Sequence, residues 1–358
     1  MKKVTLWMLV LTISILLVAS ISIAGCKKTE VTETTAAETT TAVTQSETVA
    51  ETTSEAKELT FGYIMPGPDP WYGYAKDGFV YSADKRGVKV VVVNSDYDQE
   101  KELANIDDLI TQKVDGINIF SFNPDGAQIA AQKTNAAGIP LTVEMSAIAE
   151  GPGKVVCDIE FDWKNLGVML AEYLAEKHPG EKVLEITGII GQGPIDTMLE
   201  GYKGKIEELG KNELIGVHPA DYNREKAMDI MQNMLQSGQE FTVVHVANED
   251  MAMGVLQVLK DAGKLNNPIT VISNNGSPEG LEAVKNGELE ATVSTSPGVE
   301  GIICFEVLYR HVMGDKVPEK VMIPMTWINK DNIDQAVSWE VNETTYNFAV
   351  NFLDSLIK

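Results

Sequence analysis

The sequence predicts an α/β protein with two doubly wound parallel-sheet domains, and three observations lead to this fold class. Short apolar runs alternate with longer amphipathic runs from residue 59 onward. The apolar runs are nearly continuous, which is typical of strands buried on both faces of a parallel sheet. The alternation then starts again near residue 163, so the remainder of the chain divides into two similar units.

The first unit is predicted to contain four strands separated by three helices. The strands are residues 59–64, 88–93, 116–121 and 140–143, and the helices are residues 73–86, 100–112 and 126–137. Residues 147–153, beyond the last strand, have an irregular composition. Because a helix separates each pair of successive strands, the strands are expected to run parallel.

The second unit is predicted to repeat this order. Its strands are residues 182–186, 214–217, 243–246, 269–272 and 291–294, and its helices are residues 165–177, 196–209, 224–236, 249–262 and 278–286. The sequence thus indicates a second sheet covered by helices on both faces.

Residues that directly follow the predicted strands are the candidates for ligand contact. Ligands of open parallel sheets bind beyond the carboxyl ends of the strands, and two such sheets predict a cleft between the domains. These positions are rich in polar and aromatic side chains. They are residues 69–72, 94–96, 123–125, 144, 162–163, 192–196, 221–223, 248–250 and 274–276.

The first 25 residues are predicted to be a lipoprotein signal peptide. Lys2 and Lys3 precede an apolar run, and the segment ends Ile-Ala-Gly-Cys at residues 23–26. This ending resembles the lipobox of bacterial lipoproteins, which implies that Cys26 is lipidated. An uncleaved membrane anchor is the alternative, because residues 4–24 are nearly long enough to span a bilayer. The two lysines directly after Cys26 favour lipidation, and hence an extracytoplasmic protein held to the membrane by acyl chains.

Residues 26–58 are predicted to be the lipidated cysteine and a disordered tether. Thr, Glu, Ala and Val dominate this segment, which contains no aromatic residue and no Leu beyond Cys26. Such a segment buries too little apolar surface to offset its loss of conformational entropy.

Composition excludes several classes of function. The net charge of −23 argues against nucleic acid as a partner. The sequence has no C-x-x-C or H-E-x-x-H motif, so neither a metal nor another cofactor is predicted. The four histidines are scattered, no serine lies in a G-x-S-x-G motif, and the Gly-rich residues 191–194 match no nucleotide-binding loop, so an enzyme is not predicted. Cys157 and Cys304 are expected to be buried thiols rather than a disulfide.

Several motifs in a fixed order resemble those of the type I periplasmic binding proteins, in particular the ribose-binding branch. They are Asp-Pro-Trp-Tyr at 69–72, Lys-Glu-Leu-Ala-Asn at 101–105, Asn-Pro at 123–124, Pro-Ala-Asp at 219–221, Asn-Glu-Asp-Met-Ala-Met-Gly at 248–254 and Gly-Ser-Pro-Glu-Gly at 276–280. The resemblance covers about residues 59–324. It implies a monomeric receptor that delivers a small molecule to a membrane permease powered by an ATPase, or to a sensor.

The resemblance also implies the domain boundaries. Three crossover strands near Asp162, Thr295 and Pro324 are expected to form a hinge. One lobe would contain residues 59–162 and 296–324, and the other residues 163–295 and 325–358. Ligand binding is expected to close the cleft between the lobes by a hinge motion.

The same resemblance assigns ligand contacts to individual residues. Trp71, Tyr72 and Tyr222 match aromatic residues that stack on a sugar ring, although core packing is the alternative. Polar contacts are expected from residues that could equally cap helices. The complete predicted site is Asp69, Trp71, Tyr72, Asn123, Glu144, Asp162, Trp163, Asp196, Tyr222, Asn248, Asn275 and Thr295.

Departures from the family pattern shape the expected ligand. Met145 and Asp196 stand where the ribose-binding branch carries arginines, so ribose itself is not expected. Trp163, Asn275 and Thr295 replace an Asn, an Asp and a Gln of that pattern.

Four carboxylates, those of Asp69, Glu144, Asp162 and Asp196, are expected to share the cleft. Three interpretations are open: the hydroxyls of a neutral sugar or polyol satisfy them, a cationic ligand binds them within an aromatic cage, or some have structural roles. Phosphorylated and carboxylated sugars are expected to be rejected, because their charge would be buried beside these carboxylates.

Overall fold

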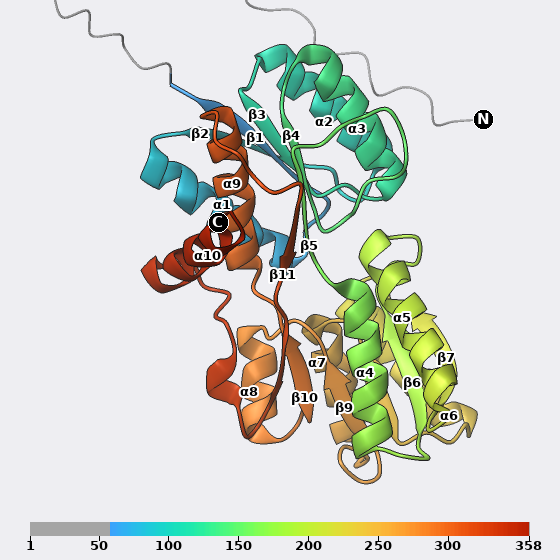
Figure 1. Ribbon diagram of the computed structural model, residues 1–358. Helices are drawn as coiled ribbons and strands as arrows, with labels where there is room; N and C mark the ends of the chain where they lie inside the picture. Colours follow the sequence, from blue (N-terminus) through green and yellow to red (C-terminus); the bar gives the residue numbers. More distant parts are fainter. Residues whose placement is uncertain (1–57, 358) are drawn as a thin grey trace, which may run out of the picture. The chain divides into compact units, whose positions relative to one another are not determined.

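Two six-stranded sheets form the framework of the chain, for which a computed structural model describes residues 58–357 (Figure 1). The described residues belong to one compact unit. The predicted signal peptide, Cys26 and all of the predicted tether except Glu58 lie outside the described residues.

The first sheet has the strand order β11-β5-β4-β3-β1-β2, and every neighbouring pair is parallel. Helices α1, α9 and α10 cover one face, and α2 and α3 cover the other. The elements are β1 (Thr60–Met65), α1 (Pro70–Arg86), β2 (Lys89–Asn94), α2 (Gln99–Gln112), β3 (Gly116–Ile119), α3 (Pro124–Ala137), β4 (Leu141–Glu144), β5 (Cys157–Phe161), α9 (Pro297–Val312), β11 (Lys320–Ile323) and α10 (Glu343–Leu356).

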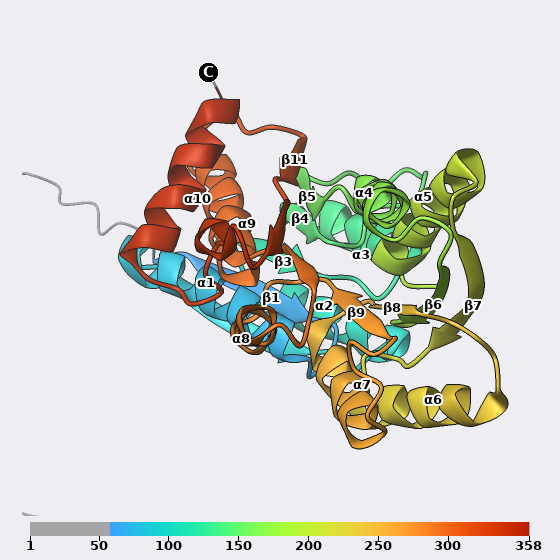
Figure 2. The same ribbon diagram turned by 90° about the horizontal axis from the view of Figure 1, so that it is seen from below.

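The second sheet has the strand order β12-β10-β9-β8-β6-β7. All pairs are parallel except β10 with the edge strand β12. Figure 2 shows α4 and α5 on one side of this sheet and α6 and α7 on the other. The elements are α4 (Trp163–Lys177), β6 (Lys182–Thr187), α5 (Gly193–Leu209), β7 (Glu213–Pro219), α6 (Arg224–Ser237), β8 (Val243–Val246), α7 (Glu249–Asp261), β9 (Thr270–Ser273), α8 (Pro278–Asn286), β10 (Ala291–Ser294), β12 (Thr326–Asn329) and the 3₁₀ helix η1 (Ile333–Gln335).

The predicted fold class is confirmed, and every predicted strand and helix is present. Several helices begin two or three residues earlier than predicted, because their first turn contains a proline, as in α1, α3 and α5. Proline suits this position, since a first-turn N–H has no partner within the helix. Cys157 and Cys304 are free thiols and both are buried, as predicted.

Polar residues between strands and helices mainly act as helix caps. Asp69, Asp98 and Asn123 cap α1, α2 and α3, and Asn248 and Ser277 cap α7 and α8 in the same way. In each case the side chain accepts a hydrogen bond from an N–H of the first turn. The carboxyl edges of both sheets are therefore lined by capping side chains, and four of the ligand candidates, Asp69, Asn123, Asp162 and Asn248, are among them.

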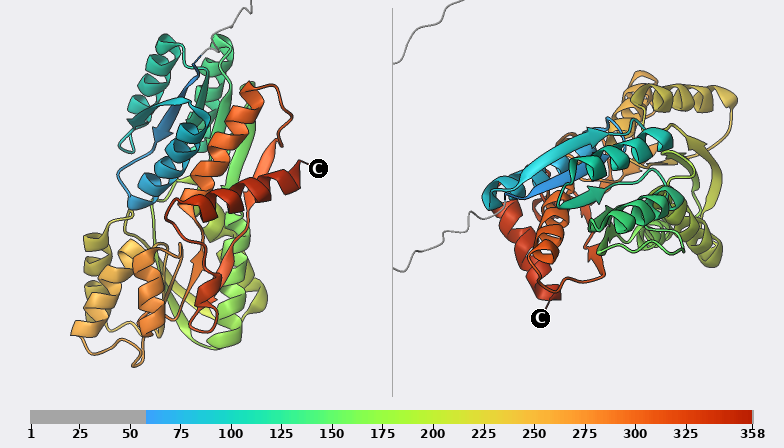
Figure 3. Two further views of the ribbon diagram at one scale, coloured as in Figure 1. Left: turned by 90° about the vertical axis from the view of Figure 1, so that its left-hand side faces the viewer. Right: turned by 90° about the horizontal axis from the view of Figure 1, so that it is seen from above.

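The chain passes between the two lobes four times rather than three. Asp162, Thr295 and Pro324 lie at passages between the sheets, at the positions predicted. A fourth passage follows η1 and brings α10 back beside α9 of the first lobe (Figure 3). The predicted assignment of residues 325–358 to the second lobe is therefore wrong for the last helix.

Packing explains the position of α10. Ala349 and Leu353 are fully buried in the core of the first lobe. Arg310 of α9 forms an ion pair with Asp354 at 2.7 Å, and the Tyr346 hydroxyl donates to Glu306 at 2.9 Å.

Candidate functional site

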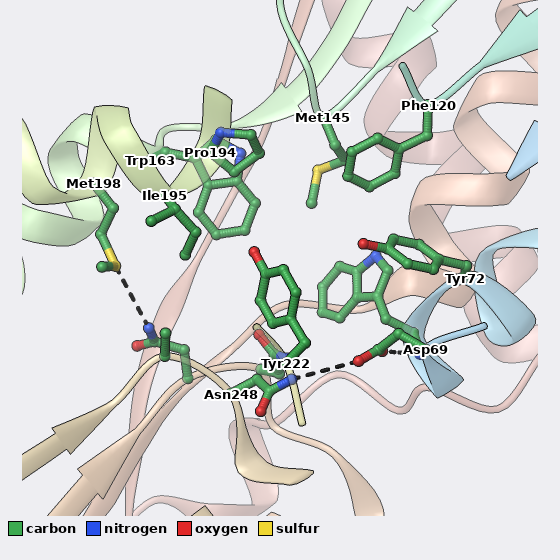
Figure 4. A pocket seen from close by; sticks show the side chains of 14 residues that line it. Asp69, Tyr72, Phe120, Met145, Trp163, Pro194, Ile195, Met198, Tyr222 and Asn248 are labelled. Carbon is green, nitrogen blue, oxygen red and sulfur yellow. Dashed lines mark hydrogen bonds between the residues drawn. The ribbon is translucent and has the colours of Figure 1, made fainter. Parts of the chain in front are cut away.

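A pocket lies between the lobes, beyond the carboxyl ends of strands in both sheets (Figure 4). Five aromatic side chains, three asparagines, one aspartate and several apolar residues surround it. The lining residues are Asp69, Trp71, Tyr72, Phe120, Met145, Trp163, Pro194, Ile195, Met198, Tyr222, Ala247, Asn248, Asn274 and Asn275.

Asp69 supplies the carboxylate of the pocket. Its Oδ1 accepts a hydrogen bond from the Trp71 backbone N–H at 2.8 Å, which caps α1. Its Oδ2 lies 3.5 Å from the amide nitrogen of Asn248, on the opposite lobe. Burial raises the pKa of Asp69 to about 6; the Trp71 N–H opposes this rise, and the charge of Asp250 adds to it. The carboxylate is thus costly to ionise without further hydrogen-bond donors.

The aromatic residues at the start of α1 are held by edge-to-face contacts. Trp71 packs against Phe161 and Trp339, with ring centroids 6.0 and 5.2 Å apart. Tyr72 packs against Phe120 at 5.1 Å with an interplanar angle of 88°. Such geometry is favourable for aromatic pairs and fixes the orientation of the rings.

Tyr222 supplies an aromatic ring from the second lobe. Its hydroxyl donates a hydrogen bond to Gln192 Oε1 at 2.6 Å, which holds the ring beside the start of α5. Burial raises the pKa of both Tyr72 and Tyr222 well above the ordinary value, so both hydroxyls are protonated at neutral pH.

Asparagine side chains line the second-lobe side of the pocket. Asn248 caps α7 through Oδ1, which accepts from the Met251 N–H at 2.9 Å, and its amide nitrogen faces Asp69. Among the described residues, the Asn275 side chain makes no hydrogen bond, whereas its backbone carbonyl accepts from Thr295 and Trp339. The side-chain amide oxygen of Asn274, Oδ1, is buried and has no hydrogen-bond partner in the described chain.

Three lining residues adopt left-handed backbone conformations. Met145 has φ 60°, Tyr222 φ 55° and Asn275 φ 115°. Residues with side chains rarely adopt positive φ, and such residues gather at binding sites when the surrounding structure holds them there. Their concentration around one pocket supports a functional role for it.

Seven of the twelve predicted site residues line the pocket, and the other five do not. Those that line it are Asp69, Trp71, Tyr72, Trp163, Tyr222, Asn248 and Asn275. Glu144 is only 1% exposed and accepts hydrogen bonds from the Tyr63 hydroxyl at 2.7 Å and the Asn118 amide at 2.9 Å. This carboxyl therefore belongs to the core of the first lobe, and its burial there raises the pKa of Glu144.

The remaining four have local structural roles. Asp162 is exposed and caps α4, and Asp196 is exposed and accepts from the Gly191 N–H at 3.1 Å. Both ends of the Asn123 amide are occupied, by Gly126 and Gln99. The Thr295 hydroxyl donates to the Asn275 carbonyl at 3.3 Å. The expectation that four carboxylates share the cleft is therefore wrong, and only Asp69 remains at the pocket.

Several apolar residues that line the pocket were not assigned to the predicted site. Phe120 directly follows β3, and Met145 follows β4. Pro194 and Ile195 lie in the first turn of α5, and Met198 follows Ile195 at helical spacing. The proline at the start of α5 could have indicated an earlier helix start, which would have placed Ile195 and Met198 on one helix face.

The two lobes contact each other around the pocket. Besides the contact of Asp69 with Asn248, Gly193 of α5 approaches the first lobe closely. A Cβ atom at Gly193 would lie 3.1 Å from the backbone carbonyl oxygen of Ser146. The cleft is therefore closed in this structure. No helix within residues 58–357 combines the length and apolar character needed to cross a membrane.

Comparison with known proteins identifies a common family. A periplasmic binding protein domain family matches residues 61–316. The ribose import binding protein of Salmonella typhimurium is 33% identical over 280 residues, covering 77% of this chain and 92% of that protein. The xylitol-binding protein of Mycolicibacterium smegmatis is 29% identical over 295 residues, covering 79% of each chain.

Solved structures share the fold. A solute binding protein from Bacillus halodurans with bound myo-inositol has a TM-score of 0.74 at 24% identity, covering 79% of this chain and 98% of that one. A protein from Mycobacterium smegmatis in complex with β-D-fucofuranose has a TM-score of 0.73 at 21% identity, covering 83% of this chain and 98% of that one.

Proposed function

We propose that this chain, which belongs to the periplasmic binding protein family, captures a small neutral sugar or polyol between its lobes and delivers it to an ABC-type permease. The pocket carries this proposal: aromatic faces stand beside amides and a single carboxylate, all beyond the carboxyl ends of two parallel sheets. Relatives named for ribose, xylitol and D-allose support the same class of ligand.

The chemistry of the pocket suits hydroxylated rings. Aromatic faces stack on the C–H groups of a sugar, amides both accept from and donate to its hydroxyls, and an ionised carboxylate accepts from them. The cavity measures about 60 Å³, which is room for roughly four to six water molecules. Such a cavity suits a small ligand, and among sugars and polyols it favours a monosaccharide or a small polyol.

Charge sets a limit on the ligand. Asp69 is the one charged side chain among the described residues that line the pocket. A sugar phosphate or sugar acid would be buried beside this carboxylate without a cation to pair with it. An amine-bearing ligand is the competing class, but the sugar- and polyol-binding relatives do not favour it.

A thermal-shift screen tests the proposal. Neutral monosaccharides, polyols, sugar acids and amines are each added to the purified protein. A ligand at a hundred times its Kd stabilises the folded state by about 2.7 kcal/mol, which gives a clear shift in Tm. Stabilisation by neutral sugars or polyols supports the proposal. Stabilisation by sugar acids or by amines alone contradicts it.

Asn275→Gly tests whether the pocket is the binding site. Glycine adopts φ 115° without strain, so this variant removes an amide that has no other partner in the described chain and should leave the fold intact. Ligand affinity should fall at least about tenfold, because a ligand hydroxyl loses its partner. Asn266→Gly is the matched control, since Asn266 is exposed and has φ 55°. Equal affinities of the two variants would place the binding site elsewhere.

The receptor is proposed to act with a permease and its ATPase, as a monomer and without turnover of the ligand. A chemoreceptor or kinase sensor could recognise the same closed form. Loss of uptake of the bound sugar in cells that lack this protein supports transport. Normal uptake with loss of a chemotactic or transcriptional response supports sensing. Consumption of the ligand by purified protein would contradict the receptor function.

Anchoring outside the cytoplasm is proposed to depend on Cys26. The Ile-Ala-Gly-Cys ending and the two lysines that follow support this proposal. The Cys26→Ala variant should lose lipid labelling, and its signal peptide should no longer be removed by the lipoprotein peptidase. Pulse labelling with a fatty-acid probe, followed by membrane fractionation, measures both. Membrane attachment of Cys26→Ala at the same size as wild type would favour a transmembrane anchor instead.

A further inference from the structure

The two sides of the pocket differ strongly in polarity. We call Asp69, Asn248, Asn274 and Asn275 the polar edge. The apolar edge consists of Phe120, Met145, Trp163, Pro194, Ile195 and Met198. In Figure 4 the six residues of the apolar edge gather in the upper half of the view, Asp69 and Asn248 lie in the lower half, and Tyr222 stands between them.

The polar edge has unused hydrogen-bonding capacity. Among the described residues, Asp69 Oδ2 makes only the long 3.5 Å contact with Asn248. Among residues 58–357, the side-chain amide oxygen of Asn274 is buried without a hydrogen-bond partner, and the Asn275 side chain has no hydrogen-bond partner either. Ligand hydroxyls placed here would find both donors and acceptors.

The apolar edge offers very little to a hydroxyl. Its one side-chain nitrogen or oxygen is the indole nitrogen of Trp163, which is buried without a partner among residues 58–357 and can donate a single hydrogen bond. The sulfur of Met198 already contacts the Asn274 amide at 3.9 Å, and Pro194 has no backbone N–H to donate. Met145 is 3% exposed and Ile195 is 5% exposed, so a group between them is shielded from water. A hydroxyl between the side chains of Met145 and Ile195, away from this indole N–H, would lose its water partners without replacement, whereas a methyl group would be buried favourably.

Resting on the proposed function, we propose that the ligand is a deoxy sugar. Its hydroxyls contact the polar edge. A CH₃ or CH₂ group, which replaces a CH₂OH or CHOH group of the parent sugar, faces Met145 and Ile195. The aromatic rings of Trp71 and Tyr222 contact the sugar between these two ends.

Matched sugar pairs test this assignment. The pairs are D-fucose with D-galactose, L-rhamnose with L-mannose, and 2-deoxy-D-ribose with D-ribose, and the members of each pair differ at one position by a hydroxyl. Calorimetric titration gives the two Kd values of each pair. In the pair whose configuration fits the polar edge, the deoxy sugar should bind about tenfold to a hundredfold more tightly. The other pairs should bind weakly or not at all.

A variant of the apolar edge tests whether this edge causes the preference for the deoxy sugar. Met145→Gln keeps the length of the side chain and adds an amide that can meet a hydroxyl. It should narrow or reverse the preference within the pair, mainly through tighter binding of the hydroxylated sugar. Met313→Gln is the control, since Met313 is 58% exposed and does not line the pocket. A preference that Met145→Gln leaves unchanged would overturn the assignment of the apolar edge.

The outcomes separate the two proposals. Equal or tighter binding of the hydroxylated member overturns the inference and leaves the sugar-binding function standing. Binding of none of the six sugars, with binding of another neutral sugar or polyol, also overturns the inference alone. Absence of binding across neutral sugars and polyols overturns both.

Discussion

Asp69 combines two roles in one side chain. It caps α1 through one oxygen and presents the other to the cleft, where burial raises its pKa from 3.8 to about 6. The folded protein therefore binds this proton more tightly than the unfolded chain does. The contribution of Asp69 to the free energy of unfolding of the ligand-free protein should accordingly fall as pH rises through this range, and then level off.

Ligand affinity should depend on pH in the opposite direction. A sugar hydroxyl donates a stronger hydrogen bond to an ionised carboxylate than to a neutral acid, so affinity should rise as pH increases through about 6. Calorimetry at about pH 5 and about pH 7.5 measures this change. Asp69→Asn can still cap α1 and should abolish the pH dependence. Asp98→Asn alters an exposed cap of α2 and should retain it. The same pH dependence in both variants would exclude Asp69 as its source.

Sequence reasoning identified most polar and aromatic residues of the pocket, although not Phe120 or Asn274, and could not decide which of its candidates face the ligand. Asp69 and Asp162 both follow a strand and both cap a helix, yet only Asp69 lines the pocket. Glu144 ends its strand on the face that packs on Tyr63, so the pleat of the strand directs it into the core. Met145, the next residue, enters the pocket because its backbone turns to φ 60°, which the identity of a methionine does not predict.

Helix α9 is the element that the sequence analysis missed because its burial is nearly complete. Helix α9 is buried from Pro297 to Leu308, between the sheet, α1 and α10, so it has no clear polar face. The position of α10 depends on contacts with α9, more than thirty residues earlier in the chain. Such long-range packing leaves no local pattern in the sequence.

The segment between η1 and α10 links the passage between lobes to the pocket. The Trp339 indole N–H donates to the backbone carbonyls of Asn275 and Thr295, at 2.9 Å each. The ring of Trp339 packs edge-on against Trp71 at 5.2 Å. One side chain therefore contacts both an aromatic residue and the backbone of an amide residue that line the pocket.

Trp339→Phe should weaken ligand binding as well as stability. The phenyl ring can keep part of the contact with Trp71, but both hydrogen bonds are lost, at a cost of about 1 kcal/mol or more in unfolding free energy. Ligand affinity should fall several-fold, because Trp71 and Asn275 are then less well held. Trp327→Phe is the control, since Trp327 stacks on Tyr173 of the second lobe at 4.7 Å and does not line the pocket. An equal loss of stability in both variants, with unchanged affinity, would limit Trp339 to a structural role.

At the scale of the whole molecule, binding requires the lobes to come close together. The pocket draws lining residues from both lobes, so opening the hinge would separate the polar edge, with Asp69 on one side and the asparagines on the other. Ligand contacts made only in the closed form shift the equilibrium towards it. Gly193 lies close to the backbone of Ser146, so a larger side chain at position 193 can limit this closure.

Gly193→Val should hold the cleft partly open. A Cβ at this position already lies 3.1 Å from the Ser146 carbonyl oxygen, and the two methyl groups of valine need further space in the closed form. Gly204→Val provides the control in the same helix, because a Cβ at Gly204 meets no atom within 4 Å. Small-angle scattering with saturating ligand should show a smaller contraction for Gly193→Val than for Gly204→Val, together with a higher Kd. Because valine has a somewhat higher helix propensity than the glycine that it replaces at either position, a difference between the variants reports on closure. Equal contraction and equal affinity would mean that the lobes do not need the Gly193 contact in order to retain the ligand.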